Sequence, residues 1–222
     1  MFNKKPHISC LISAGPTREW IDPVRFLSNP SSGKMGYALA ETARDLGMKV
    51  TLVSGPVSIP TPEGMEVIKV ETANEMKSAM LSTFDNANLI IMCAAVSDHR
   101  PAKYTESKIV KDQFPSHLEL ARNPDILKHL GGLKKVDQVL VGFAAETKEV
   151  LLSAKKKLVE KNLDWIIANN VSNEQGGFSS DKNEVILIGS GGQEHPFALD
   201  DKQIIAQKLL NVIYPSCIEK AR

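Results

Sequence analysis

Short apolar segments alternate with segments of helical periodicity along most of the chain. Strands are predicted over residues 7–14, 49–54, 66–70, 88–93, 137–143 and 164–168. Helices are predicted over residues 33–46, 72–84, a short segment that starts at 123, and 147–161. This alternation is typical of an α/β fold in which helices cover both faces of a mostly parallel sheet. We predict that fold here.

The end of the chain departs from this alternation. Residues 184–189 and 195–198 flank a glycine-rich turn and predict a small C-terminal antiparallel hairpin. A last helix is predicted over 200–213, with Ile204, Ile205, Leu209 and Val212 on its inward face. A chain of 222 residues can bury a sizeable core. We therefore expect a single domain over residues 1–222.

Three helix starts carry capping signals. Thr72 and Glu75 have the spacing of a capping box. Ser31 and Ser32 are expected to open the helix over 33–46. Asn123 is expected to cap the short helix, because the proline that follows it suits the first helical position.

Charge and composition narrow the function. Lys and Arg number 27 against 26 Asp and Glu, a formal net charge of +1. This balance argues against nucleic acid or an anionic membrane surface as the main partner. The three cysteines are far apart in sequence, and no apolar segment approaches the length of a membrane span. We expect a soluble, cytoplasmic protein.

Known nucleotide motifs are missing from the loops where ligands of such folds bind. Parallel sheets bind ligands beyond the carboxyl ends of their strands, here the loops after residues 14, 54, 93, 143 and 168. Gly15-Pro16-Thr17 follows the first strand, which does not match the dinucleotide fingerprint. The segment 28–35 lacks the first glycine of a P-loop and has Met35 in the place of the Ser or Thr that binds magnesium. No metal-binding spacing of Cys and His is present.

The loop between residues 15 and 34 is the first candidate site. It offers Arg18, Arg25 and Asn29 beside a helix start, and the N–H groups of a helix N-terminus attract anions. Arg25 would add a bidentate phosphate contact. The alternative is that Arg18 and Arg25 pair with neighbouring carboxylates, those of Glu19 and Asp22.

Two further candidate sites are basic or polar segments. Small residues at 94–96 precede Asp98, which would accept from a ligand hydroxyl or hold a metal ion. The loop after it carries Lys103, Lys108 and Lys111, either as a solvated face or as a lid that brings Lys108 to a polyphosphate. Lys157 and Lys161 share one helix face, as an ordinary basic surface or as a triphosphate site. Together these features indicate an enzyme of nucleotides or phosphate esters.

Several motifs, in their order and spacing, resemble phosphopantothenoylcysteine synthetase, the ligase (CoaB) portion of the bifunctional bacterial coenzyme A biosynthesis protein. They are GPTREWIDPVRFLSNPSSGKMG, AAVSDHRP, KIVK, NPDIL, VGFAAET and KLVEKNLDWIIANNVS. The resemblance runs from about residue 8 to 213. It implies a Rossmann-like α/β domain that forms a homodimer.

The resemblance implies an activity. The family activates 4′-phosphopantothenate with CTP to an acyl-cytidylate and releases pyrophosphate. The amine of L-cysteine then attacks, which gives 4′-phosphopantothenoylcysteine and CMP. Magnesium (Mg2+) is expected to assist. No flavin and no decarboxylation are expected of this chain, because 222 residues cannot hold both halves of the bifunctional protein. The decarboxylase would be a separate or fused partner.

The resemblance also assigns residues. Asn29 matches the residue that contacts the acyl-cytidylate, Arg25 a substrate-side arginine, and Lys108 the catalytic lid lysine. The expected CTP-binding residues are Met92, Cys93, Ala94, Asp98, Lys108, Pro124, Asp125, Ile126, Leu127, Phe143, Lys157 and Lys161. Ser97, His99 and Val110 replace the commoner Ala, Tyr and Lys of the family.

Two other classes of function remain open at this point. An NAD(P)-dependent oxidoreductase would need a glycine-rich turn after the first strand and an acidic residue at the end of the second. The second strand ends in Ser54-Gly55-Pro56 instead. A non-catalytic nucleotide-binding subunit would bind nucleotide without turnover, and the presence of both Asn29 and Lys108 argues against it. ATP in place of CTP is a variant of the ligase.

Overall fold

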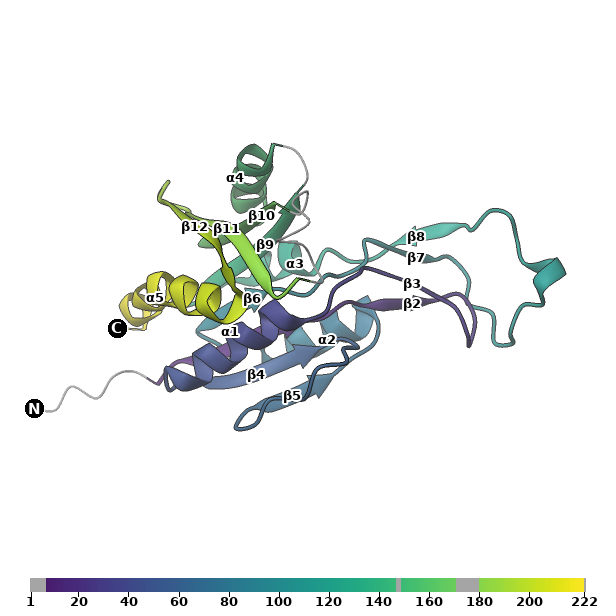
Figure 1. Cartoon of the computed structure of the whole chain (residues 1–222), viewed down its shortest axis with the longest axis horizontal. Coiled ribbons are helices and arrows are strands. Elements are labelled where there is room, and N and C mark those ends of the chain that lie inside the picture. The colour runs from purple at the N-terminus through teal and green to yellow at the C-terminus, as the bar shows by residue number, and fades with distance from the viewer. Residues whose placement is uncertain (1–6, 147–148, 171–179, 222) are drawn as a thin grey trace, which may run out of the picture.

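A computed structural model describes residues 7–146, 149–170 and 180–221. Its centre is an eight-stranded sheet with the strand order β12-β11-β10-β9-β6-β1-β4-β5 (Figure 1). Six strands are parallel: β1 (Ser9–Ala14), β4 (Lys49–Ser54), β5 (Glu66–Lys69), β6 (Leu89–Met92), β9 (Val139–Glu146) and β10 (Trp165–Asn170). The predicted parallel sheet is confirmed.

The predicted C-terminal hairpin is confirmed and is longer than expected. Strands β11 (Lys182–Gly189) and β12 (Glu194–Asp201) run antiparallel and extend the sheet beyond β10. The register between them shifts between Asn183 and Val185. Such a bulge bends its strand and redirects the side chains around it.

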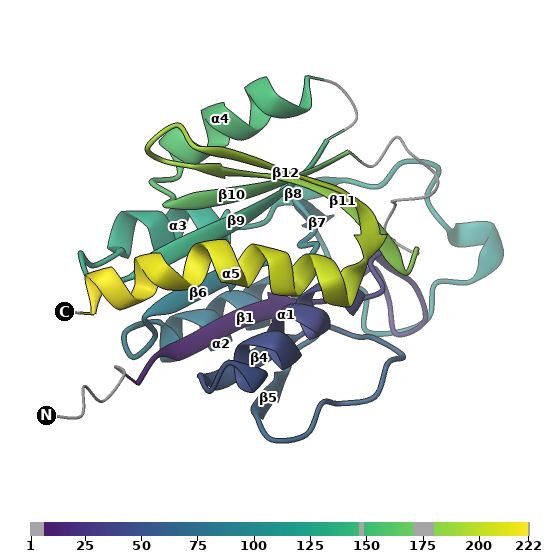
Figure 2. The ribbon, with the colours of Figure 1, turned by 60° about the vertical axis from the view of Figure 1, so that its left-hand side comes forward.

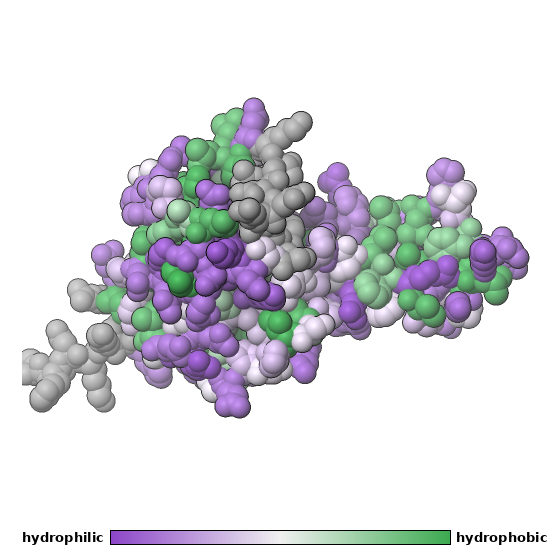
Figure 3. Space-filling model, viewed as in Figure 1, coloured by the Kyte–Doolittle hydropathy of each residue, from purple (hydrophilic) through white to green (hydrophobic). Residues whose placement is uncertain are grey.

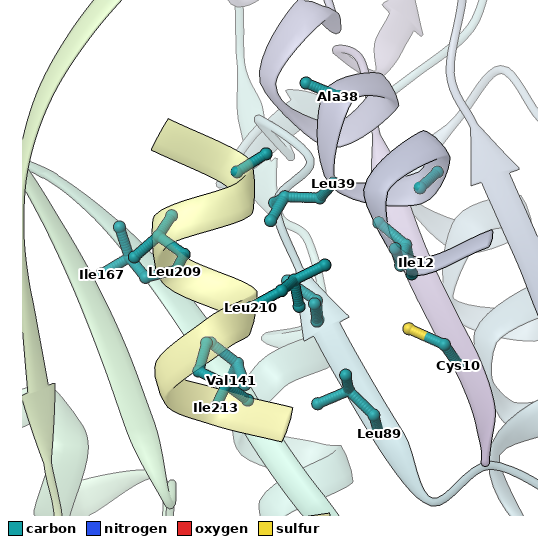
Figure 4. Packing of buried hydrophobic residues seen from close by; sticks show 14 of the residues in the cluster. Cys10, Ile12, Ala38, Leu39, Leu89, Val141, Ile167, Leu209, Leu210 and Ile213 are labelled. Atoms are coloured by element: carbon teal, nitrogen blue, oxygen red, sulfur yellow. The ribbon is translucent and has the colours of Figure 1, made fainter. Parts of the chain in front are cut away.

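Helices cover both faces of the sheet, as predicted. Helices α1 (Lys34–Asp45) and α5 (Lys202–Lys220) lie side by side on one face, as Figure 2 shows. Helices α2 (Ala73–Phe84), α3 (Ile126–Leu133) and α4 (Val150–Glu160) pack on the other. Strand residues alternate between the faces: Cys10 and Ile12 face α1 and α5, and Leu11 faces α2. Figure 4 shows Leu209, Leu210 and Ile213 of α5 packed into the first of these two cores.

The helix starts differ from the predictions at α2 and at α3. The Thr72 hydroxyl accepts from the backbone N–H of Glu75, as expected for a capping box, but the Glu75 carboxylate accepts from Glu71. Asn123 was the wrong cap for α3, because Asp125 caps it by accepting from the N–H of Lys128. The predicted start of α4 at 147 lies outside the described residues, and the helix is observed from Val150.

Helices α1 and α5 also differ in detail. Gly33 precedes α1 in the left-handed region (φ 77°), and no side chain caps this helix. Helix α5 continues to Lys220 through Pro215, past the predicted end at 213. Buried Cys217 and an ion pair from Lys220 to Asp164 (2.7 Å) hold this last part of the helix against the sheet.

Two small hairpins were predicted as loops, which was wrong. Strands β2 (Arg18–Trp20) and β3 (Phe26–Ser28) form one, and β7 (His99–Pro101) and β8 (Leu120–Arg122) form the other. A turn of 3-10 helix, η1 (Lys111–Gln113), lies in the connection between β7 and β8. We call residues 18–28 and 99–122 together the arm. Figure 1 shows it projecting from the sheet. Among the described residues, no helix has the length and apolarity needed to cross a membrane.

We expect a Gly36→Val substitution to destabilise the protein by about 1–3 kcal/mol, the usual range for overpacking. Helix α1 approaches β1 so closely that a Cβ at Gly36 would lie 2.5 Å from the Ala14 Cβ. Urea unfolding measures the change. Gly132→Ala is the matched control, because nothing lies within 4 Å of its added Cβ. Equal stability of Gly36→Val and the wild type would contradict the packing described.

Candidate active site

A cavity of about 330 Å³ lies at the carboxyl ends of β6, β9 and β10, beside the N-terminus of α1. Its walls come from segments that are far apart in sequence, which the parallel sheet brings to one edge. The lining residues are Asn29, Pro30, Ser31, Ser32, Gly33, Lys34, Met35, Gly36, Cys93, Ala94, Ala95, Val96, Phe143, Ala144, Ala145, Asn169, Asn183 and Lys202. Four of the predicted site residues are therefore in one cavity: Asn29, Cys93, Ala94 and Phe143.

Hydrogen bonds from the end of β1 fix the backbone wall of the cavity. The N–H of Cys93 donates to the Ser13 carbonyl (3.2 Å), and the N–H of Ala94 donates to the Ser13 hydroxyl (3.2 Å). The N–H of Ala95 donates to the Gly15 carbonyl (2.9 Å). This backbone therefore meets a ligand in one defined conformation. Met92, which precedes it, is buried.

Asn29 is anchored to the same wall. Its Nδ2 donates to the Ala95 carbonyl at 3.1 Å, so the side-chain amide is held against the wall of the cavity. The chain from Asn29 then enters α1 through Gly33, whose positive φ suits glycine. The first N–H groups of a helix have no partner within the helix, so Gly33–Gly36 present a partial positive charge to the cavity.

Phe143 lies on β9 next to Gly142. A Cβ at Gly142 would lie 2.8 Å from the Leu127 Cδ2 and 2.9 Å from the Leu163 Cδ1, so the glycine lets both leucines pack against β9. Successive side chains of a strand point to opposite faces. Leu127 therefore packs on one face of β9 at Gly142. The next side chain, Phe143, points to the opposite face and lines the cavity.

The surroundings of Cys93, which is partly buried, argue against a nucleophilic role. Desolvation raises the pKa of its thiol to about 12, an increase that the charge of Lys202 partly offsets. The thiol is therefore protonated near neutral pH, and thiolate is the reactive form. Cys93 therefore serves as part of the cavity wall.

The predicted residues Asp98, Pro124 and Asp125 lie beyond this cavity. The Asp98 carbonyl accepts from the N–H of Asn123 (2.8 Å), and the Asn123 amide donates to the Ser97 carbonyl (2.8 Å). These bonds join the loop after β6 to the start of α3. The Asp98 side chain is exposed there.

Lys161 pairs with Asp125 across α3 and α4. Its ammonium lies 2.9 Å from the Asp125 Oδ2 and donates to Oδ1 at 3.0 Å. Partial burial raises the pKa of Asp125, but hydrogen bonds from Lys161 and the N–H of Lys128 outweigh burial and lower it. Ile126 and Leu127 are the first two residues of α3. This second group of predicted residues, with Lys157 on α4, does not line the cavity.

Arg25 and Lys108 lie on the arm. Asp22 is fully buried and accepts from the Arg25 guanidinium through Nε (3.0 Å) and Nη2 (2.6 Å). It also accepts from the N–H groups of Val24, Arg25 and Ile109. The Arg25 hydrogen bond is the main reason that the pKa of Asp22 is well below its usual range. Lys108, the neighbour of Ile109, is exposed, and neither predicted residue lines the cavity.

The internal pairing considered as an alternative for the two arginines is half right. Arg25 pairs with Asp22 as that alternative required. Arg18 instead approaches Glu71 at 3.6 Å, and the Glu19 carboxylate accepts from the N–H of Ala73 (2.9 Å).

Four polar residues of the cavity were not predicted as site residues: Lys34, Asn169, Asn183 and Lys202. The Asn169 Oδ1 is buried and has no hydrogen-bond partner among the residues that the structure describes. Asn183 and Lys202 are 2% and 7% exposed. Asn169 directly follows the strand predicted over 164–168, which is the one signal that could have found it. Lys202 at a helix start has no such signal. No group of three metal-binding side chains occurs in residues 7–146, 149–170 and 180–221.

A family model described as the DNA/pantothenate metabolism flavoprotein C-terminal domain matches residues 6–216. The chain belongs to this family. It is 43% identical over 99% of its length to the Escherichia coli coenzyme A biosynthesis bifunctional protein CoaBC, and 47% identical over 91% of its length to the Bacillus subtilis protein of that name. It covers 55% and 50% of those proteins, so it spans about half the length of these relatives.

Solved structures of the family share the fold. The crystal structure of the C-terminal domain of a CoaBC protein is 41% identical, with a TM-score of 0.80, and the match covers 94% of this chain and 95% of that one. A Cab2 variant in complex with phosphopantothenate-cysteine has the same fold at 19% identity (TM-score 0.76, 96% of this chain and 87% of that one). The resemblance inferred from the sequence motifs is confirmed.

We expect Asp22→Asn to loosen the arm. An amide lacks the charge that attracts Arg25, and it has only one oxygen to replace two. Hydrogen exchange at the N–H groups of Val24 and Ile109 should become about tenfold faster or more. Asp85→Asn, which breaks an exposed pair with Lys135 (2.7 Å), is the control and should leave both unchanged.

The stabilisation that the Asp22 carboxylate gives to the arm should decrease as the pH falls. The pKa of Asp22 is lower in the folded protein, so its contribution to stability is present above the ordinary Asp pKa. It is lost as the pH falls through the lowered value. If the N–H groups of Val24 and Ile109 exchange at the same rate in Asp22→Asn and in the wild type at neutral pH, this account is contradicted.

Proposed function

We propose that this chain is a phosphopantothenate–cysteine ligase of coenzyme A biosynthesis, with CTP as the activating nucleotide. One observation carries the proposal: the chain matches nearly all of a solved CoaBC C-terminal domain at 41% identity. Its cavity supports the proposal, because it joins an anchored amide, a helix N-terminus and an aromatic wall at the carboxyl edge of a parallel sheet.

The first step joins two anions. A carboxylate oxygen of 4′-phosphopantothenate attacks the α-phosphorus of CTP, the bond to the β-phosphate breaks, and pyrophosphate leaves. Anions repel one another, so the site must neutralise charge and position the reactants. The N-terminus of α1, through Gly33–Gly36, supplies partial positive charge without any movement of the protein.

The second step forms the amide. The amine of L-cysteine attacks the acyl carbon of the acyl-cytidylate, CMP leaves, and the amine loses a proton. Charge develops on the acyl oxygen as the carbon becomes tetrahedral. The Asn29 amide is held by Ala95 at the wall of the cavity, so we assign it to contact the acyl-cytidylate.

The remaining predicted residues are assigned to the nucleotide. Phe143 would pack against the cytidine, and the wall of Met92, Cys93 and Ala94 would meet it with backbone groups. Lys157, Lys161 and the α3 start at Pro124, Asp125, Ile126 and Leu127 would bind its other parts. Mg2+ usually binds one or two carboxylates plus substrate phosphates. Exposed Asp98 fits that role, and the ion would neutralise the triphosphate.

Arg25 and Lys108 need the arm to reach a substrate. Asp22 and Ile109 use the Nε and Nη2 of Arg25, so the guanidinium is held firmly, with its Cζ 4.1 Å from the centre of the Phe114 ring. Since neither residue lines the cavity of its own chain, we propose that they act on substrate from an arm that belongs to a homodimer.

The surface of the arm supports a homodimer. Figure 3 shows apolar atoms gathered on the projecting arm. Its exposed apolar side chains are Val24, Phe26, Tyr104, Val110, Phe114 and Leu120, between 37% and 56% exposed. Large exposed apolar patches mark protein–protein contacts. Sedimentation of the purified chain should show a dimer, and Leu120→Asp should shift it toward a monomer.

Pyrophosphate release tests the proposed reaction. The chain would be incubated with 4′-phosphopantothenate, magnesium and either CTP or ATP, with and without L-cysteine. The proposal predicts turnover that needs phosphopantothenate, is sustained only with cysteine, and is faster with CTP. A folded chain that binds CTP and releases no pyrophosphate would contradict the ligase and leave a nucleotide-binding subunit.

Two variants should separate the two steps. Lys108→Gln removes the lid charge and should slow acyl-cytidylate formation about 10²-fold or more. Asn29→Asp replaces a donor with a carboxylate and should slow conversion of the acyl-cytidylate to product by a similar factor. The controls are Lys49→Gln and Asn86→Asp, both at exposed positions near the amino edge of the sheet. Normal rates in either site variant would remove that residue from the mechanism.

A further inference from the structure

The cavity has a basic end that none of the assignments above uses. Lys34 begins α1 and Lys202 begins α5, and both line the cavity. Helices α1 and α5 are neighbours on one face of the sheet, so their first residues come together at its carboxyl edge (Figure 2). Two lysines from distant parts of the sequence thus meet beside the N-terminus of α1.

Lys202 is held in the wall of the cavity. It is 7% exposed, and its ammonium donates to the Ser180 carbonyl at 2.5 Å. Its backbone N–H donates to the Asp181 carbonyl (2.9 Å), which fixes the start of α5. Burial, and then the charge of Lys34, lowers the pKa of Lys202. A lysine that is buried to this extent presents its charge to a ligand at a fixed place.

The β-bulge in β11 shapes this end of the cavity. Asn183 lies where the register between β11 and β12 shifts, and it pairs with Asp200, two residues before Lys202. Its side chain is 2% exposed and also lines the cavity. Bulges often redirect side chains beside functional sites. Here the bulge places an amide next to the lysine.

One carboxylate faces the two lysines. The ammonium of Lys34 donates to the carboxylate of Asp181. This carboxylate belongs to a residue that lines a second hollow, of about 740 Å³, between α1 and α5. The Asp181 side chain is 79% exposed, and it lines this outer hollow but not the cavity. Lys34 and Lys202 line both the cavity and this outer hollow, and they are the charged residues among those that line the cavity.

We propose that Lys202, with Lys34 and the first turn of α1, forms a phosphate-binding subsite of the cavity, and that Lys202 is a positioning residue for the ligase reaction. This inference rests on the proposed function for the identity of its ligand. Two reactants carry the same chemistry: the β- and γ-phosphates of the nucleotide, which leave as pyrophosphate, and the phosphate monoester of 4′-phosphopantothenate. Lys202 and Lys34 would hold either group by charge-assisted hydrogen bonds.

Direct binding tests the subsite without turnover. Calorimetry would measure the affinity of the full chain for inorganic pyrophosphate and, separately, for 4′-phosphopantothenate. Lys202→Gln should weaken one of the two about tenfold or more, and Lys202→Arg should restore most of the loss, since the charge returns. Whichever probe responds identifies the source of the phosphate. Lys208→Gln is the matched control on α5, because Lys208 pairs with Asp200 (2.8 Å) outside the cavity.

Steady-state kinetics distinguish positioning from a merely structural role. Lys202→Gln should raise the KM for the corresponding substrate by a similar factor and reduce the dependence of KM on salt, with a smaller change in kcat. Unchanged affinity for both probes in a folded Lys202→Gln variant would overturn the subsite. If the wild type binds pyrophosphate through Lys202 but shows no turnover with any nucleotide, the subsite stands and the proposed function fails.

Discussion

The parallel pairing of β1 with β6 is the constraint on which the site depends. Ile12 lies opposite Ile91 and Ser13 opposite Met92, so both strands end at the same edge of the sheet. The end of β1 then holds the backbone of Cys93, Ala94 and Ala95 through three hydrogen bonds. Buried backbone groups must find partners, and here they do so by making the wall of the cavity rigid. Asn29 donates to the Ala95 carbonyl, so the same wall fixes the position of its side chain.

The parts that could be predicted from the sequence are those whose signal is local. The strand from Leu89 to Met92 is apolar at every position because helices cover both of its faces, and such a run is recognisable without the structure. The arm gave no such signal. Its strands are three residues long and include the charged residues Arg18, Glu19 and Arg100. Strands this short and polar show no run of apolar or alternating residues from which periodicity could predict them.

The candidate site divides in the same way. Asn29 and Phe143 were predicted because they belong to recognisable motifs, and the structure brings them into one cavity. Lys202 was missed because a lysine at the start of a helix is common and gives no signal in the sequence. It lines the cavity because α5 packs beside α1, which only the structure shows. The predicted end of α5 at residue 213 was likewise too early. The buried Cys217 and the ion pair between Lys220 and Asp164 depend on the packing of α5 against the sheet, and they extend the helix past that residue.

Charge is the problem that this architecture must solve for the proposed reaction. A carboxylate, a phosphate ester and a triphosphate meet in one cavity, and water must not take the activated acyl group. The cavity offers fixed positive charge from α1, Lys34 and Lys202, while Arg25 and Lys108 are carried on the arm. In the proposed homodimer, this division would separate a permanent part of the site from a part that the arm supplies.

The most direct measurement is a crystal structure of the full chain with a non-hydrolysable CTP analogue and 4′-phosphopantothenate. The account predicts that the substrate carboxylate and the α-phosphate meet in the cavity lined by Asn29, Ala94 and Phe143. A nucleotide bound elsewhere, for example in the outer hollow between α1 and α5, with the cavity unchanged, would contradict the account.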